Sequence, residues 1–98
     1  MAPHLPRKAT GVARSNDLLR AALFQIGTLV AIERHRKDWT QEELAAQVGL
    51  TQVDVSRIEN GEAPAGGVTD AKIGALFTLL GLPQRQANFV KWWRRALG

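Results

Sequence analysis

A repeated dipeptide limits what this chain can fold into. Residues 39–61, WTQEELAAQVGLTQVDVSRIENG, contain Thr-Gln twice, eleven residues apart. Thr40 and Glu43 have the spacing of a capping box, in which the threonine oxygen accepts from the third helical N–H and the acid accepts from the backbone N–H of the cap. Thr51 and Asp54 have the same layout with a shorter acid. Each doublet therefore predicts the start of a helix, where the helix dipole also favours a carboxylate.

The interval between these starts leaves room for one short helix. Gly49 favours the left-handed backbone conformation that ends a helix, so the first helix is confined to residues 41–48. The second helix begins after Thr51 and occupies the residues up to 60. Two short helices joined by a turn of three to four residues with a glycine form a helix-turn-helix, and we expect that arrangement here.

The two faces of each short helix differ in polarity. On a helical projection, Leu44, Ala45 and Val48 share one face of the first helix, and the small Ala45 allows the second helix to approach closely. In the second helix, Val55 and Ile58 point inward. The opposite arc combines an amide, a branched methyl group, a hydroxyl and a guanidinium, which suit the reading of base edges. Its members are Gln52, Val53, Ser56 and Arg57.

The rest of the chain predicts helices and no strand. Residues 15–37 carry apolar side chains at helical spacing, as one long helix or as two joined near Gly27. Residues 70–80 carry another apolar stripe that ends at Gly81, and residues 83–98 form a last helix. The expected fold class is all-α, a compact bundle of about five helices.

The chain divides into three predicted segments. Residues 1–14, with two prolines and a glycine, are expected to be a flexible basic arm. Residues 15–82 hold the helix-turn-helix domain with an N-terminal helical extension. Residues 83–98 form a C-terminal aromatic and basic helix for packing or dimerisation. A chain of 98 residues suffices for one domain with one modest core.

Charge is distributed unevenly along the chain. The formal net charge is +4 and the pI is near 10.4. Residues 1–14 and 85–98 contain seven basic residues and no acid, whereas residues 15–84 contain six basic and nine acidic residues. Basic ends around a mildly acidic middle favour a nucleic-acid partner only modestly, because many soluble proteins have basic tails.

Composition argues against several classes of protein. There is no cysteine, and His4 and His35 lack further ligands at suitable spacing, so we expect no metal site. No histidine–carboxylate constellation or glycine-rich phosphate loop supports catalysis, so we expect no catalytic residues, no enzyme and no cofactor. The apolar runs fall short of the roughly 20 residues that span a bilayer, and the N-terminus is not of the signal type. A soluble, cytoplasmic protein without a membrane partner is expected.

Residues 40–61, TQEELAAQVGLTQVDVSRIENG, resemble the Xre/Cro/lambda-repressor family of helix-turn-helix domains. The glutamine that opens each helix, the ELA triplet, the glycine turn and the terminal IENG stand as in that family. The resemblance covers roughly residues 25–82 and is strongest over residues 39–61. It implies a bacterial or phage-encoded protein whose partner is double-stranded DNA.

The resemblance also implies roles for individual side chains. The helix over residues 51–60 would enter the major groove. There, glutamine can pair with adenine, arginine with guanine, and valine can meet a thymine methyl group. The expected base contacts are Gln52, Val53, Ser56 and Arg57, the expected phosphate contacts are Thr40, Gln41, Thr51, Asn60 and Gly61, and the expected structural ion pair joins Arg34 to Glu59.

Less specific interpretations stay open for several of these residues. Arg57 can instead pair with Asp54 one turn back on the helix. Gln52 can serve only as a helix-start residue, and an exposed Val53 needs no function. The basic side chains of the arm either contact the minor groove or the phosphates, or they form a solvated tail. These side chains are Arg7, Lys8 and Arg14.

The C-terminal helix carries an aromatic cluster. Trp92 and Trp93 are adjacent, so they cannot both face one core. One is expected to pack beneath the domain and the other to be exposed unless a second subunit covers it. Together with Phe89 they are the expected packing or dimer contacts, and the resemblance implies a symmetric homodimer.

These features predict one of two functions. The first is a sequence-specific transcriptional regulator, a repressor that occupies a promoter by binding a palindromic operator as a dimer. The alternative is an antitoxin, because many small proteins that resemble this family neutralise a partner toxin and repress their own operon.

Overall fold

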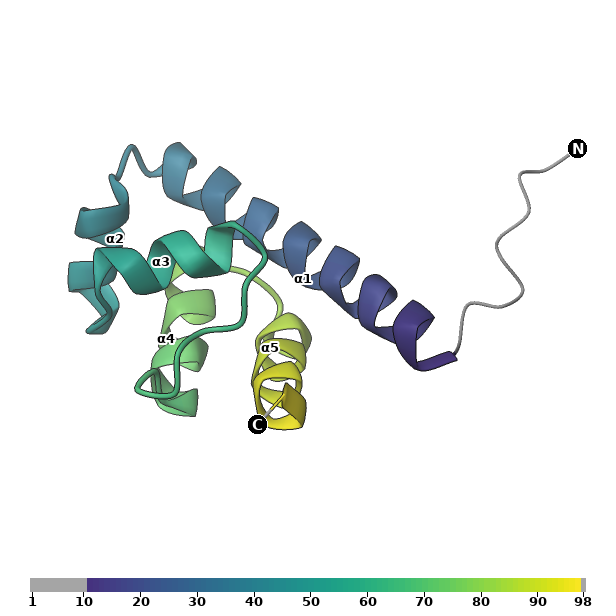
Figure 1. The fold of residues 1–98 in the computed structure, drawn as a ribbon. Coiled ribbons are helices and arrows are strands. Elements are labelled where there is room, and N and C mark those ends of the chain that lie inside the picture. The colour runs from purple at the N-terminus through teal and green to yellow at the C-terminus, as the bar shows by residue number, and fades with distance from the viewer. Residues whose placement is uncertain (1–10, 98) are drawn as a thin grey trace, which may run out of the picture.

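The computed structural model describes residues 11–97, and the side chains of residues 17–96. Within this range the chain forms five helices and no strand, which confirms the predicted all-α class (Figure 1). The helices are α1 (Gly11–Arg36), α2 (Gln41–Val48), α3 (Gln52–Glu59), α4 (Asp70–Leu80) and α5 (Gln84–Leu97).

α1 is one continuous helix of 26 residues, which decides between the two arrangements left open by the sequence. α3 approaches α1 closely at Gly27, because a Cβ there would stand 2.2 Å from the carbonyl oxygen of Ile58. A single glycine costs a helix only about 1 kcal/mol relative to alanine, so α1 tolerates it without breaking. This glycine is a packing site for α3.

α1 begins at Gly11, so the arm predicted over residues 1–14 is wrong for residues 11–14. That segment contains no proline, and its alanine and arginine favour helix, so a helix already nucleated continues past the predicted start at Ser15. The expected arm contacts Arg7 and Lys8 lie outside the described residues. Arg14 belongs to α1, but its side chain also lies outside the described ones.

α2 and α3 begin with the two predicted capping boxes. Thr40 Oγ1 accepts from the Glu43 N–H at 3.0 Å, and Glu43 Oε1 accepts from the Thr40 N–H at 2.9 Å. Thr51 and Asp54 make the same reciprocal pair, at 3.1 and 2.9 Å. Gly49 ends α2 in the left-handed conformation with φ 74°. Both boundaries of the turn are therefore set by local hydrogen bonds.

All five helices contribute to one hydrophobic core. α3 lies between α1 and α2 and packs against both, while α4 and α5 pair with each other beneath them (Figure 1). The N-terminal half of α1 extends past the rest of the molecule. The largest fully buried side chains are Leu23, Val30, Leu44, Val55, Ile58, Ile73, Leu76, Phe77 and Val90.

The loop between α3 and α4 is held to the domain at its second half. Val68 is buried, and its carbonyl oxygen accepts from Arg94 of α5. Arg94 also pairs with Asp70 in the first turn of α4, and Arg95 pairs with the same carboxylate. Two of the basic residues near the C-terminus are thus engaged with an acid of the domain itself.

Within residues 11–97, no helix combines the length and the apolarity that crossing a bilayer demands. In the same range, no group of three or more histidine, cysteine or carboxylate side chains is arranged to hold a metal ion.

Candidate nucleic-acid interface

The inner face of α3 is held firmly against the domain. Val55 and Ile58 are buried in the core. The backbone of Ile58 and Glu59 lies so close to Gly27 of α1 that any side chain there would collide with it. Because α3 has only eight residues, these contacts determine which of its sides faces solvent.

The outer face of α3 carries the four predicted base contacts. Gln52, Val53 and Arg57 are exposed, and Ser56 is half-buried. Val53 is 61% exposed, although both other apolar residues of the helix are buried. The structure therefore brings the four side chains to one surface, and their contact with bases stays a prediction.

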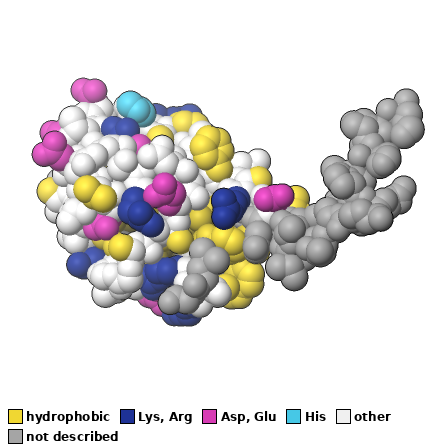
Figure 2. Space-filling view, viewed as in Figure 1, with side chains coloured by type: hydrophobic (Ala, Val, Ile, Leu, Met, Phe, Trp, Pro, Cys, Tyr) yellow, Lys and Arg dark blue, Asp and Glu magenta, His cyan; other side chains and the backbone are white. Residues whose placement is uncertain are grey.

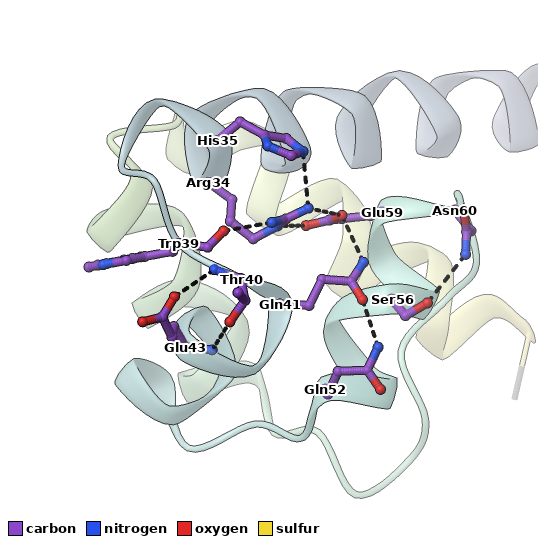
Figure 3. Close-up of polar contacts among 10 residues, drawn as sticks. All are labelled: Arg34, His35, Trp39, Thr40, Gln41, Glu43, Gln52, Ser56, Glu59 and Asn60. Atoms are coloured by element: carbon purple, nitrogen blue, oxygen red, sulfur yellow. Dashed lines mark hydrogen bonds and ion pairs between the residues drawn. The ribbon is translucent and has the colours of Figure 1, made fainter.

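A buried ion pair joins α1 to the end of α3 (Figure 3). Arg34 Nε lies 2.6 Å from Glu59 Oε2, and Arg34 Nη2 donates to Glu59 Oε1 at 3.1 Å. Arg34 Nη1 donates to the backbone carbonyl of Trp39 at 2.7 Å. The two charged side chains are only 9% and 8% exposed. This pair, which the resemblance assigns a structural role, fixes α3 relative to α1 and to the start of α2.

The same carboxylate orients two glutamines. Gln41 Nε2 donates to Glu59 Oε1 at 3.0 Å, and Gln41 Oε1 accepts from Gln52 Nε2 at 2.6 Å (Figure 3). A continuous polar chain thus runs from Arg34 through Glu59 and Gln41 to the exposed Gln52. Gln41 was predicted to contact a phosphate, and each amide nitrogen carries two N–H groups, so one donor of Gln41 stays available for that contact.

Arg57 has a partner that the sequence did not predict. Its Nη1 lies 3.3 Å from Glu62 Oε1, and its Nη2 donates to the carbonyl of Ala63 at 3.2 Å. Asp54, the alternative partner considered from the sequence, is occupied in its capping box with Thr51. The Arg57 and Glu62 side chains are 44% and 54% exposed, so the pair contributes only about 0–1 kcal/mol and can exchange partners.

The backbone N–H groups around Gly61, a predicted phosphate contact, are already engaged. The N–H groups of Asn60, Gly61 and Glu62 all donate to carbonyls of α3, at 3.0, 3.1 and 2.8 Å. No backbone donor at these three positions is free for a phosphate. The Asn60 side chain is exposed and makes one long contact, 3.4 Å, with Ser56 Oγ. Thr40 and Thr51 use their oxygens as acceptors in the caps and keep their hydroxyl hydrogens as donors.

One of the two tryptophans of α5 is buried and the other is exposed, as expected. Trp93 is 5% exposed and belongs to the core, whereas Trp92 is 52% exposed. Phe89 is half-buried, and its ring lies 6.0 Å from that of Trp92 at an angle of 45°. The structure therefore leaves one tryptophan on the surface of α5.

Two residues of this region were not singled out from the sequence. Glu62 acts on Arg57 as described above, and Arg20 of α1 lines a cleft with Arg57 at the end of α3. Glu62 directly follows the recognisable motif, which was the available signal. Arg20 lies far from the motif in the sequence, and only the path of α1 along α3 brings it near.

Comparison with known proteins identifies one family. A family model described as a helix-turn-helix domain matches residues 25–89, which is 65 of the 98 residues. The match runs from the second half of α1 into α5 and contains the whole α2–α3 pair. No curated protein and no solved structure matches the chain. The family match confirms the resemblance carried by residues 40–61.

Proposed function

The chain belongs to the helix-turn-helix domain family, and from that premise we propose that it is a sequence-specific transcriptional regulator that binds double-stranded DNA in the cytoplasm. In this proposal α3 lies in the major groove and α2 crosses the DNA backbone. The proposed base contacts are Gln52, Val53, Ser56 and Arg57, and the proposed phosphate contacts are Thr40, Gln41, Thr51 and Asn60.

The observation that carries this proposal is the bonding of the Gln52 amide. One of its N–H groups is donated to Gln41. Its second N–H and its Oε1 have no hydrogen-bond partner within residues 17–96. Adenine presents one acceptor and one donor in the major groove, at N7 and N6. The two groups of Gln52 that stay open match this pair, while the buried ion pair behind Gln41 keeps the amide in place.

The finer proposal is a repressor that binds a palindromic operator as a homodimer. Two-fold symmetry would present α3 to two half-sites about one helical turn apart. The surface we propose for dimerisation is the exposed Trp92 together with the α1–α5 groove, an apolar depression of about 640 Å³ between those helices. Hydrophobic side chains gather on the side of the molecule where α1 and α5 lie (Figure 2). The residues that line the groove are Ala22, Phe24, Gln25, Ile26, Thr28, Leu29, Arg85, Gln86 and Phe89.

Selection of the intact protein on random duplexes at moderate salt tests the proposal. One sequence with two related half-sites should be enriched, and Arg57→Ala should relax the preference at one base position by about 1–3 kcal/mol. Trp92→Ala should preserve the half-site preference and reduce the fraction of dimer in light scattering. If the wild-type protein enriches no sequence, the proposed function is wrong.

A second candidate function is an antitoxin, and the α1–α5 groove is the observation that favours it. The groove is apolar and is lined by α1 and α5, with no residue of α3, so a toxin seated there would leave α3 free to bind an operator. Affinity capture from the source cells should then recover a stoichiometric protein partner. Its loss with Phe89→Ala, but not with Arg57→Ala, would favour the antitoxin over a self-sufficient regulator.

A further inference from the structure

A cleft of about 630 Å³ opens where α3 ends. One wall is α1, which contributes Arg20, Ala21 and Phe24, and the other is the end of α3 with the first residues of the loop after it. The buried Trp93 of α5 also lines the cleft. Gly61 packs directly on α1, so closely that a Cβ on the glycine would lie 2.9 Å from the Phe24 Cα. Packing between α1 and the end of α3 therefore shapes the cleft.

The cleft contains two guanidinium groups and one carboxylate. Arg20 is exposed and has no ion-pair partner among the described side chains, residues 17–96. Arg57 stands on the opposite wall and shares its charge with Glu62 at 3.3 Å. The Asn60 amide, a neutral donor, lines the same wall. The net charge of the side chains that line the cleft is +1. No carboxylate within residues 17–96 pairs with the Arg20 guanidinium.

The position of Arg20 relates this charge to α3. Arg20 lies seven residues before Gly27, which is about 10 Å along α1 from the contact of Gly27 with α3. The cleft borders the outer face of α3, because Arg57 belongs to both. Basic and acidic side chains are interspersed over this view of the molecule (Figure 2). For an anionic partner, the unpaired Arg20 beside α3 is therefore a more specific attraction than the net charge of the surface.

We propose that this cleft receives a backbone phosphate of the bound DNA, with Arg20 as the side chain that contacts it. The proposal rests on the proposed function and adds to it a contact outside the family match, which begins at residue 25. Guanidinium binds phosphate through two parallel N–H donors, and the Asn60 amide supplies a third donor from the other wall. The N-terminal extension of α1 is then part of the DNA-binding surface.

The test compares two cations that differ in position. Arg20→Gln removes the cleft cation, and Lys72→Gln on α4 is the control, because Lys72 also lacks an ion pair within residues 17–96 and lines neither the cleft nor the α1–α5 groove. Affinity for the selected duplex is measured at several salt concentrations. Each phosphate contact adds about 0.9 to the slope of log K against log salt. Arg20→Gln should lower the slope by about 0.9 per chain, and Lys72→Gln should leave it at the wild-type value.

Ethylation interference gives a second readout that a merely structural role would not move. Arg20→Gln should abolish interference at one phosphate per half-site and leave the base preference intact. An unchanged slope and interference pattern with Arg20→Gln, on DNA that the wild type still selects, overturns this inference alone. An equal loss of slope with Lys72→Gln also overturns it. If the wild-type protein selects no duplex, the proposed function and this inference fail together.

Discussion

Two arginine–glutamate pairs involve α3 and differ in their surroundings. Arg34 and Glu59 are almost wholly buried, and the guanidinium makes further contacts with the backbone of Trp39. Arg57 and Glu62 are about half exposed and share one longer contact. Removing one member of a buried pair leaves an uncompensated charge, whereas an exposed pair exchanges its partner for solvent or for DNA. The degree of burial therefore distinguishes an ion pair that stabilises the fold from an ion pair whose arginine can bind a ligand instead.

The largest expected effect tests the buried pair directly. Glu59→Ala should lower the free energy of unfolding by about 3–5 kcal/mol, because Arg34 would be left buried without its counter-charge. Urea unfolding followed by far-UV circular dichroism measures it. Glu62→Ala is the matched control and should cost less than about 1 kcal/mol. Equal losses for the two variants would contradict the distinction between the pairs.

The next effect tests the packing that places Glu59 against α1. Gly27→Ala should destabilise the protein by about 1–3 kcal/mol, because the new Cβ meets backbone that cannot rotate away. The control is Gly74→Ala in α4, where the nearest atom to a new Cβ is 3.9 Å away, at the end of the Gln84 side chain. That variant should stabilise by about 0.4–1 kcal/mol. Thermal unfolding of both separates them, and a stabilised Gly27→Ala would refute the close α1–α3 contact.

A smaller effect concerns the other end of α3. Thr51→Ala removes the side-chain oxygen that accepts from the Asp54 N–H, and should cost about 0.5–2 kcal/mol. Thr51→Ser keeps that oxygen and should stay near wild type in the same urea titration. The loss should be smaller than with Glu59→Ala, since the cap is solvated and the ion pair is not. A larger loss would show that α3 is held chiefly at its N-terminus.

The smallest effect sharpens the role of the exposed pair. Glu62→Gln should change stability by less than about 0.5 kcal/mol, and should raise affinity for DNA by roughly 1.4- to 5-fold, because it frees Arg57 and removes a carboxylate that repels phosphate. Glu42→Gln on α2 removes the same charge from an exposed residue outside the cleft. Fluorescence anisotropy with a labelled duplex compares them. An equal gain for both variants would mean that net charge, rather than the release of Arg57, is responsible.

What the sequence predicted well depends on local interactions. The ends of α2 and the start of α3 follow from capping boxes and a left-handed glycine. Each of these features joins residues no more than four positions apart in the chain. The separation of Trp92 from Trp93 follows from helix geometry alone. Such features are independent of the path of distant segments, so the sequence suffices for them.

What the sequence missed depends on the path that the chain takes outside the regular helices and on how the helices pack. Arg57 pairs with Glu62 because the loop after α3 turns back along the helix, and no local pattern predicts that turn. The blocked N–H of Gly61 has the same cause. The role of Gly27 follows only from the packing of α3 against α1. In the sequence alone, a glycine within a helical pattern is equally consistent with a break in the helix and with a close packing contact. The side chains on the outer face of α3 and the Arg34–Glu59 pair were thus predictable, and the partner of Arg57 was not.

The polar chain that ends at Gln52 has a consequence for the cost of recognition. A surface glutamine normally samples several rotamers, and immobilising such a side chain on binding costs about 0.5–1.5 kcal/mol. Here Gln41 already restrains the amide, and Gln41 is itself restrained by the buried carboxylate of Glu59. The ordering takes place when the protein folds. If Gln52 contacts a base as proposed, the buried Arg34 on α1 contributes to affinity at a base that it does not touch.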